Sequence, residues 1–99
     1  MPQLTIVFWR DIPAQVIARE GRRAAKRELG PRFQQAIDRA AMAAGLHGSD
    51  DYLAAWRRGA PVACGDDLDE AASTEAARLE REFDDPRLDA LAASGGVAS

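Results

Sequence analysis

The sequence contains one cysteine, Cys64, and one histidine, His47. A single thiol cannot form an internal disulfide, so the sequence excludes a disulfide framework and any metal site built from several cysteines. A single imidazole excludes a histidine-rich metal site for the same reason. Aromatic residues make up only 6% of the chain, and much of its 46% apolar content is alanine, which buries little area per residue.

Long apolar runs and phosphate-binding glycine motifs are also absent. No stretch approaches the roughly 18 apolar residues that a membrane-spanning helix needs, and the start MPQLTIVFWRD lacks the basic region of a signal peptide. We therefore expect a soluble protein of the cytoplasm that does not enter a membrane. The glycines are scattered singly and form neither a P-loop nor a dinucleotide fingerprint, so no cofactor is predicted.

The 99 residues leave room for one hydrophobic core. We predict a single domain over residues 1–93. Leu88 and Leu91 are expected to form one more helical turn near its end. The small residues of ASGGVAS bury too little area to offset the entropy of ordering them, so we predict a flexible tail over 94–99.

The net charge of −3 conceals a difference between the two halves of the chain. Residues 1–48 carry eight Lys/Arg and four Asp/Glu, a charge of +4, whereas residues 49–99 carry five and twelve, a charge of −7. Such asymmetry indicates either a charged partner or complementarity within the molecule, and it bears on partners more than on fold.

The first third of the chain has the pattern of an antiparallel sheet. Residues 4–9 are β-branched, aromatic and apolar, which predicts a strand, and Pro13 favours a turn after it. Residues 15–20 form either a second strand or a helix. Residues 22–29 form either a third strand, with Gly21 as the hairpin turn, or a short basic helix, and we prefer the strand.

After residue 30 the apolar period becomes helical. Apolar stripes with capping residues predict helices near 31–44, 50–58 and 67–83. Together with a small, mostly antiparallel sheet over 4–29, this predicts an α+β fold in which about three helices cover one face of the sheet.

Few residues have the pattern of a catalytic site. Cys64 and His47 match no spacing of a thiolate and its base, and a lone cysteine is more often a small buried hydrophobe. Paired aspartates such as Asp66 and Asp67 stand at predicted helix starts or stops, where capping explains them better than metal binding does. The sequence therefore predicts a protein that is not an enzyme.

A basic run between residues 19 and 27 is the one feature that suggests a ligand. Glutamates interrupt this run and it has no aromatic residue for stacking on bases, so an acidic protein face is a better partner for it than nucleic acid. Both tryptophans lie beside arginines, a combination enriched where proteins meet. The candidate interaction surface comprises Trp9, Arg10, Asp11, Arg22, Arg23, Lys26, Arg27 and Trp56.

Three segments resemble a known family. FWRDIPAQVIAREGRRAAKREL at 8–29, RFQQAIDRAAMAAG at 32–45 and DDYLAAWRRG at 50–59 resemble the small bacterial "virulence factor" domain, which is also similar to the C-terminal part of conserved virulence factor C. The resemblance covers about residues 4–62. It implies a contribution to virulence traits and transfers no catalytic residue. It also implies an association with methyltetrahydrofolate and corrinoid methyl-transfer enzymes, in which this chain is an accessory subunit.

Two functional hypotheses follow. The first is a non-catalytic accessory or adaptor protein that docks on a larger cytoplasmic enzyme, such as a methyltransferase-type complex, or on a second copy of itself. The second is a protein that binds a small anionic ligand resembling a folate or a corrinoid, or a minor enzyme subunit, with the same arginines holding the ligand.

Overall fold

A computed structural model describes residues 1–46 and 48–98 of the chain. The strands are β1 (Gln3–Trp9), β2 (Ile12–Glu20), β3 (Arg23–Glu28), β4 (Trp56–Arg58) and β5 (Val62–Ala63). The helices are α1 (Pro31–Ala43), α2 (Asp50–Ala54), α3 (Leu68–Glu82) and α4 (Asp85–Ala93). This confirms the predicted α+β fold.

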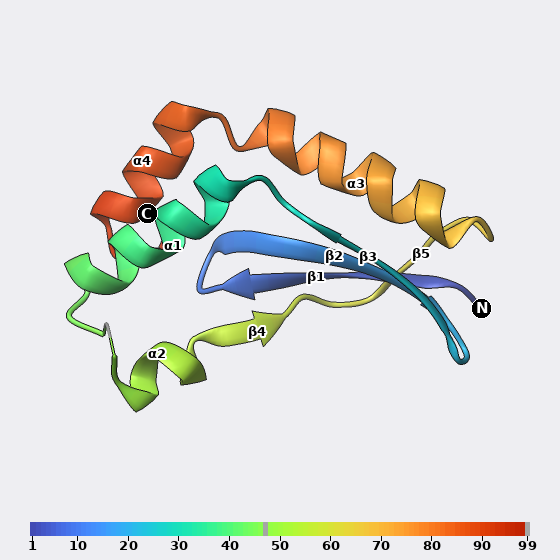
Figure 1. Cartoon of the computed structure of the whole chain (residues 1–99), viewed down its shortest axis with the longest axis horizontal. Helices are drawn as coiled ribbons and strands as arrows, with labels where there is room; N and C mark the ends of the chain where they lie inside the picture. Colours follow the sequence, from blue (N-terminus) through green and yellow to red (C-terminus); the bar gives the residue numbers. More distant parts are fainter. Residues whose placement is uncertain (47, 99) are drawn as a thin grey trace.

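The strands form one open antiparallel sheet in the order β3, β2, β1, β4, with β5 paired to the start of β1 (Figure 1). The strand alternatives for 15–20 and 22–29 are confirmed. Gly21 has a φ of +58° in the β2–β3 hairpin, a conformation that glycine adopts without strain.

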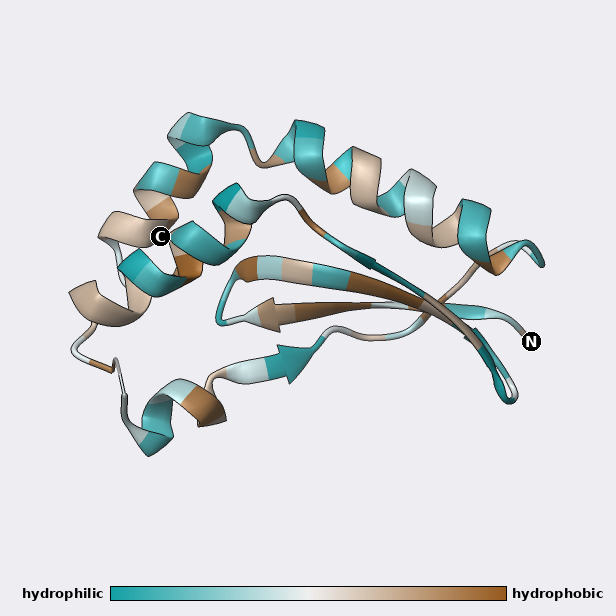
Figure 2. Cartoon of the chain, viewed as in Figure 1, coloured by the Kyte–Doolittle hydropathy of each residue, from teal (hydrophilic) through white to brown (hydrophobic). Residues whose placement is uncertain are grey.

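One face of the sheet packs against α3. Residues paired directly across antiparallel strands share a face, so Leu4, Ala18 and Ala25 form one row, and Ile6, Val16 and Arg27 form the next. Their apolar members join the core or pack against it, together with Leu68, Ala72 and Leu79 of α3. Figure 2 shows hydrophobic residues along β1 and β2 and hydrophilic residues along β3.

Helices α1 and α4 pack together around the end of the sheet where β1 turns into β2 (Figure 1). Trp9 and Ile12 stand at this turn and are fully buried. The apolar stripe of α1 supplies Phe33, Ile37 and Ala40 to the same core, as the helical period predicts. Sheet and helices thus share one core.

The predicted helix over 50–58 is wrong beyond its first turn. Helix α2 ends at Ala54, and residues Trp56–Arg58 form β4, in which Trp56 pairs with Trp9. The segment YLAAWRR favours a helix locally, but pairing with the edge of β1 satisfies its backbone and overrides that preference. Leu53, an apolar residue of α2, is 65% exposed and does not anchor the helix to the core.

Pro13 lies inside β2 and not in the turn, which corrects a second expectation. The pairing of β1 with β2 shifts register between Val7 and Phe8, so Pro13 pairs with Phe8 next to a bulge. A bulge tolerates proline because ladder hydrogen bonds are interrupted there. Strand β2 therefore begins at Ile12, next to the turn.

The end of the chain makes contacts that its composition does not predict. The expected last helical turn is the nine-residue helix α4. Beyond it, Gly95 and Gly96 are buried. The backbone N–H of Asp11 donates to the Gly96 carbonyl at 2.8 Å, and the N–H of Ala98 donates to the Asp11 carboxylate at 2.7 Å. Residue 99 lies outside the described residues.

No helix among the described residues combines the length and the apolar character required to cross a membrane.

Candidate functional site

The predicted interaction residues do not form one surface. Trp9 is completely buried, and its indole Nε1 donates to the Tyr52 carbonyl at 2.9 Å. Arg10 lies above the Trp9 ring, 5.4 Å from its centroid, and donates to the Gly95 carbonyl at 3.0 Å. Trp9 is therefore a core residue that cannot meet a partner, and Arg10 holds the end of the chain.

Asp11 and Arg27 also serve contacts within the molecule. Asp11 accepts from Arg57 at 3.2 Å, which ties the β1–β2 turn to β4. Arg27 lies on the face of the sheet that α3 covers, where it donates to Ser73 at 3.0 Å and pairs with Asp69 at 3.4 Å. Arg27 therefore links β3 to α3.

The other four predicted residues are accessible. Arg22 and Arg23 are exposed at or next to the tip of the β2–β3 hairpin, and Lys26 is exposed on β3. Trp56 is half-buried on β4, with its ring edge-on to Tyr52 at 6.4 Å between centroids. Lys26 and Trp56 belong to the face of the sheet opposite α3.

We call this opposite face the open face. The register places three rows of side chains on it. The rows comprise Gln3, Arg19 and Ala24; Thr5, Ile17 and Lys26; and Val7, Gln15, Glu28 and Arg58, with Trp56 beside the last row. Ile17 is only 4% exposed although it lies outside the main core cluster, so the open face buries an apolar residue among its polar neighbours.

The cations of the open face, unlike most others of the described residues, form no ion pair with a carboxylate. Most arginines form an ion pair within 4.0 Å, including Arg27, Arg32 and Arg39. Within residues 1–46 and 48–98, six cations do not: Arg10, Arg19, Arg22, Lys26, Arg58 and Arg81. Three of these six lie on the open face, and Arg22 adjoins it. Uncompensated positive charge is thus concentrated there.

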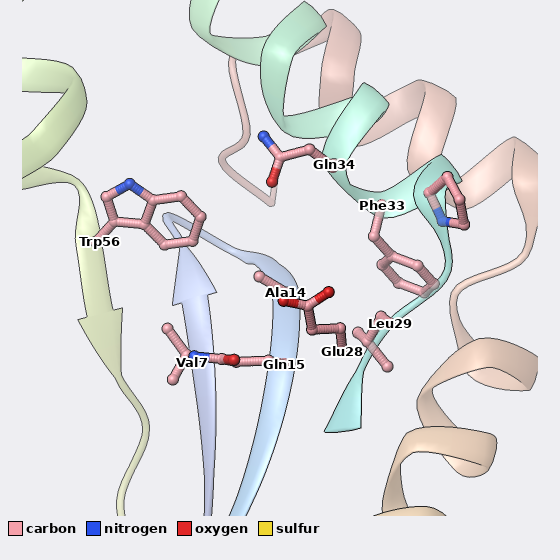
Figure 3. A pocket seen from close by; sticks show the side chains of 9 residues that line it. Val7, Ala14, Gln15, Glu28, Leu29, Phe33, Gln34 and Trp56 are labelled. Carbon is pink, nitrogen blue, oxygen red and sulfur yellow. The ribbon is translucent and has the colours of Figure 1, made fainter. Parts of the chain in front are cut away.

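A hollow of about 750 Å³ lies where the open face meets the start of α1 (Figure 3). Val7, Leu29, Phe33 and Trp56 give it apolar walls, and Gln15, Glu28 and Gln34 supply polar groups. A smaller hollow of about 200 Å³ lies at the other end of the face, between Arg19 and Arg58. The open face therefore has a large, mainly apolar hollow and a small hollow flanked by two arginines.

Part of the positive charge of the N-terminal half pairs with carboxylates of the C-terminal half. Arg32, at the start of α1, pairs with Glu80 at 3.1 Å and with Asp85 at 3.2 Å, and Arg39 pairs with Asp89 at 3.0 Å. Divided at residue 66, the part that holds the sheet has ten Lys/Arg and six Asp/Glu, and the part that holds α3 and α4 has three and ten. We call α3 and α4 the acidic helical layer, in which α3 packs on the basic sheet region and α4 packs on α1.

The remaining candidates have structural roles. Asp67 caps α3 by accepting the N–H of Glu70 at 3.1 Å, as predicted for the Asp66–Asp67 pair, and Asp84 caps α4 by accepting the N–H of Arg87 at 3.0 Å. Cys64 is half-buried and packs against the core. His47 lies outside the described residues, so its pairing with Cys64 stays untested. Across the described chain, no three His, Cys, Asp or Glu side chains gather as metal ligands.

A family described as Virulence factor matches residues 7–92. The chain belongs to this family. Membership confirms the resemblance and extends it beyond residue 62, because the match continues through α3 and most of α4. The matched residues therefore include part of β1, strands β2 to β5 and most of the acidic helical layer. No curated protein and no solved structure is significantly similar to the chain.

Proposed function

We propose that this member of the Virulence factor family is an accessory protein that binds an acidic surface of a larger protein through its open face. The observation that carries the proposal is the group of cations Arg19, Lys26 and Arg58, which no carboxylate of the described chain neutralises. By contrast, Arg27, Arg32 and Arg39 pair with carboxylates of the acidic helices α3 and α4. Complementary charge speeds encounter and selects the partner.

The binding is by contact and not by catalysis. The open face offers two arginines, Arg19 and Arg58, and a half-buried tryptophan, Trp56, and these residue types are enriched at protein interfaces. A methyl-transfer enzyme is one partner that the resemblance suggests. The acidic character of the partner follows from the cations alone.

Site-specific photo-crosslinking in the native host tests the proposal. A benzoylphenylalanine at Thr5, in the middle of the open face, is compared with one at Ala77, which is exposed on α3. We expect Thr5 to capture a protein whose cross-linked segment is acidic, and the double variant Arg19→Glu/Arg58→Glu to abolish that capture. Equal capture from both positions, or capture that survives the charge reversal, would refute the proposal.

A second copy of the chain is an alternative occupant, since its own helical layer is acidic. Sedimentation of the purified protein separates the two cases. A mass that rises with concentration, and does not rise for the Arg19→Glu/Arg58→Glu variant, would assign the open face to self-association and overturn the proposal of a separate partner. A constant monomer mass supports that separate partner.

The smaller hollow favours a second candidate function, the binding of a small anion. Arg19 and Arg58 flank it with Thr5 between them, an arrangement suited to a carboxylate or a phosphate. A thermal-shift series with phosphate, citrate and methyltetrahydrofolate tests this candidate. A ligand that binds only the native state must raise its melting temperature, so no shift at millimolar concentrations would refute it.

A further inference from the structure

The large hollow and the unpaired cations lie on the same face, but they call for different chemistry. No cation of the described residues lines the hollow, and the Glu28 carboxylate, which does line it, repels acidic groups. The half-buried Trp56 ring and Val7 line one side of it, and Leu29 and the almost fully buried Phe33 ring line the other (Figure 3). An acidic segment that crosses the open face must therefore present an uncharged group at this end.

We propose that the hollow receives an aromatic side chain, a tyrosine in the first instance, from the acidic segment that the open face binds. This inference rests on the proposed function and specifies the sequence of its partner. The half-buried Trp56 ring favours an aromatic occupant, because rings gain from edge and offset contacts in addition to the area they bury. The Glu28 carboxylate and the Gln15 amide oxygen can accept a hydrogen bond from a tyrosine hydroxyl. A leucine anchor has no hydroxyl and would leave these acceptors without that hydrogen bond.

The strand register sets the spacing between anchor and carboxylates. Val7 lies in the row that lines the hollow, Thr5 in the middle row and Gln3 in the row of Arg19. Successive rows are two residues apart, or about 7 Å, because a strand rises about 3.4 Å per residue. Lys26 thus lies one row from the hollow and Arg19 two rows away. An extended segment that follows the strands meets both cations with acidic residues about two and four positions from its tyrosine.

The two tryptophans provide a built-in reporter and its control. The Trp56 indole lines the hollow, whereas the Trp9 indole is buried and bonded to the Tyr52 carbonyl. In a proton–nitrogen correlation spectrum of the intact protein, an occupant of the hollow should move the Trp56 indole signal and leave the Trp9 signal in place. The probes are two short serine–glycine peptides with glutamates two and four positions after either a tyrosine or an alanine.

We expect the tyrosine peptide to bind about tenfold more tightly than the alanine peptide and to shift the Trp56 signal. Trp56→Ala should remove that difference, and Trp56→Phe, which keeps a ring beside Tyr52, should retain most of it and guards against a variant that does not fold. Leu53→Ala, an exposed apolar position off the open face, is the matched control and should change neither peptide's affinity.

Each remaining outcome separates the two proposals. Equal affinity for both peptides, lost on Arg19→Glu/Arg58→Glu, would overturn the aromatic anchor and leave the acidic partner standing. A preference for the tyrosine peptide that is unchanged in Arg19→Glu/Arg58→Glu would support the hollow as an apolar site and overturn the proposal of an acidic partner. Titration to millimolar peptide without a shift at Trp56 or at the open-face amides would overturn both.

Discussion

The ring of Trp9 lies against Gly96 so closely that a Cβ on this glycine would be 2.8 Å from the ring atom Cζ3. Gly96 also has a φ of +88°, a conformation that other residues rarely adopt. The relationship joins residues from opposite ends of the chain. It closes the core around the largest fully buried side chain of the described residues.

Gly96→Ala is expected to destabilise the protein because it combines backbone strain with a clash against a ring that cannot move. The free energy of unfolding should fall by about 1–3 kcal/mol, measured by urea denaturation. Gly65→Ala is the control, because a Cβ there meets open space and the backbone has no positive φ. It should change stability by less than about 0.5 kcal/mol. Equal effects of both variants would contradict the packing described for Gly96.

Removing residues 95–99 is expected to destabilise the protein by more than removing residues 97–99. The longer deletion removes the acceptors for Asp11 N–H and for Arg10, and it uncovers Trp9. We expect a loss of about 2–4 kcal/mol, together with a red shift of tryptophan emission. Two deletions that both match the full-length protein in a urea melt would show that these contacts add no stability.

Arg32→Ala is expected to loosen the junction between α1 and the α3–α4 turn. The Arg32 guanidinium donates to the Phe83 and Glu80 carbonyls, both at 2.5 Å, and to the Glu80 carboxylate at 3.1 Å. Its loss should lower the free energy of unfolding by about 1–3 kcal/mol. Arg32→Lys should recover only part of that, because an ammonium cannot reproduce the planar set of donors. Arg81→Ala, on an exposed residue of α3, should be neutral, and a comparable loss there would contradict this account.

Tryptophan emission should separate the two indoles. In Trp56→Phe the remaining Trp9 is fully buried, so its emission should be blue-shifted and protected from iodide. In Trp9→Phe the remaining Trp56 is half-buried at the hollow, so its emission should lie at longer wavelength and be quenched more strongly. Trp9→Phe must first be shown to be folded by circular dichroism. The reverse order of quenching would contradict the burial of Trp9.

Local patterns predict most of this fold, because they depend on neighbours in the sequence. Pro31 and the stripe from Phe33 to Ala41 are enough to predict α1, and Asp67 with Leu68 marks the start of α3. Strand β4 could not be predicted in this way. Trp56 extends a helical pattern, and only pairing with Trp9, far away in the sequence, makes it part of a strand.

The candidate site depends still more on distant contacts. The sequence places Arg27 and Lys26 side by side in one basic run, but they point to opposite faces of β3. Arg27 is paired with Asp69 under α3, whereas Lys26 lies on the open face. Arg58 was not among the predicted residues and joins the site only because β4 pairs with β1. Strand alternation was the available signal, and it separates Lys26 from Arg27 once residues 22–29 are assigned to a strand.

The acidic helical layer lies against one face of the sheet, and uncompensated cations lie on the other. This separation gives the molecule an electric dipole directed across the sheet, although its net charge is only −3. In the field of an acidic partner, such a dipole turns the molecule during approach, so that the cationic face arrives first. The encounter would therefore be oriented before any side chain makes contact, and raising the ionic strength would slow association more than it would speed dissociation.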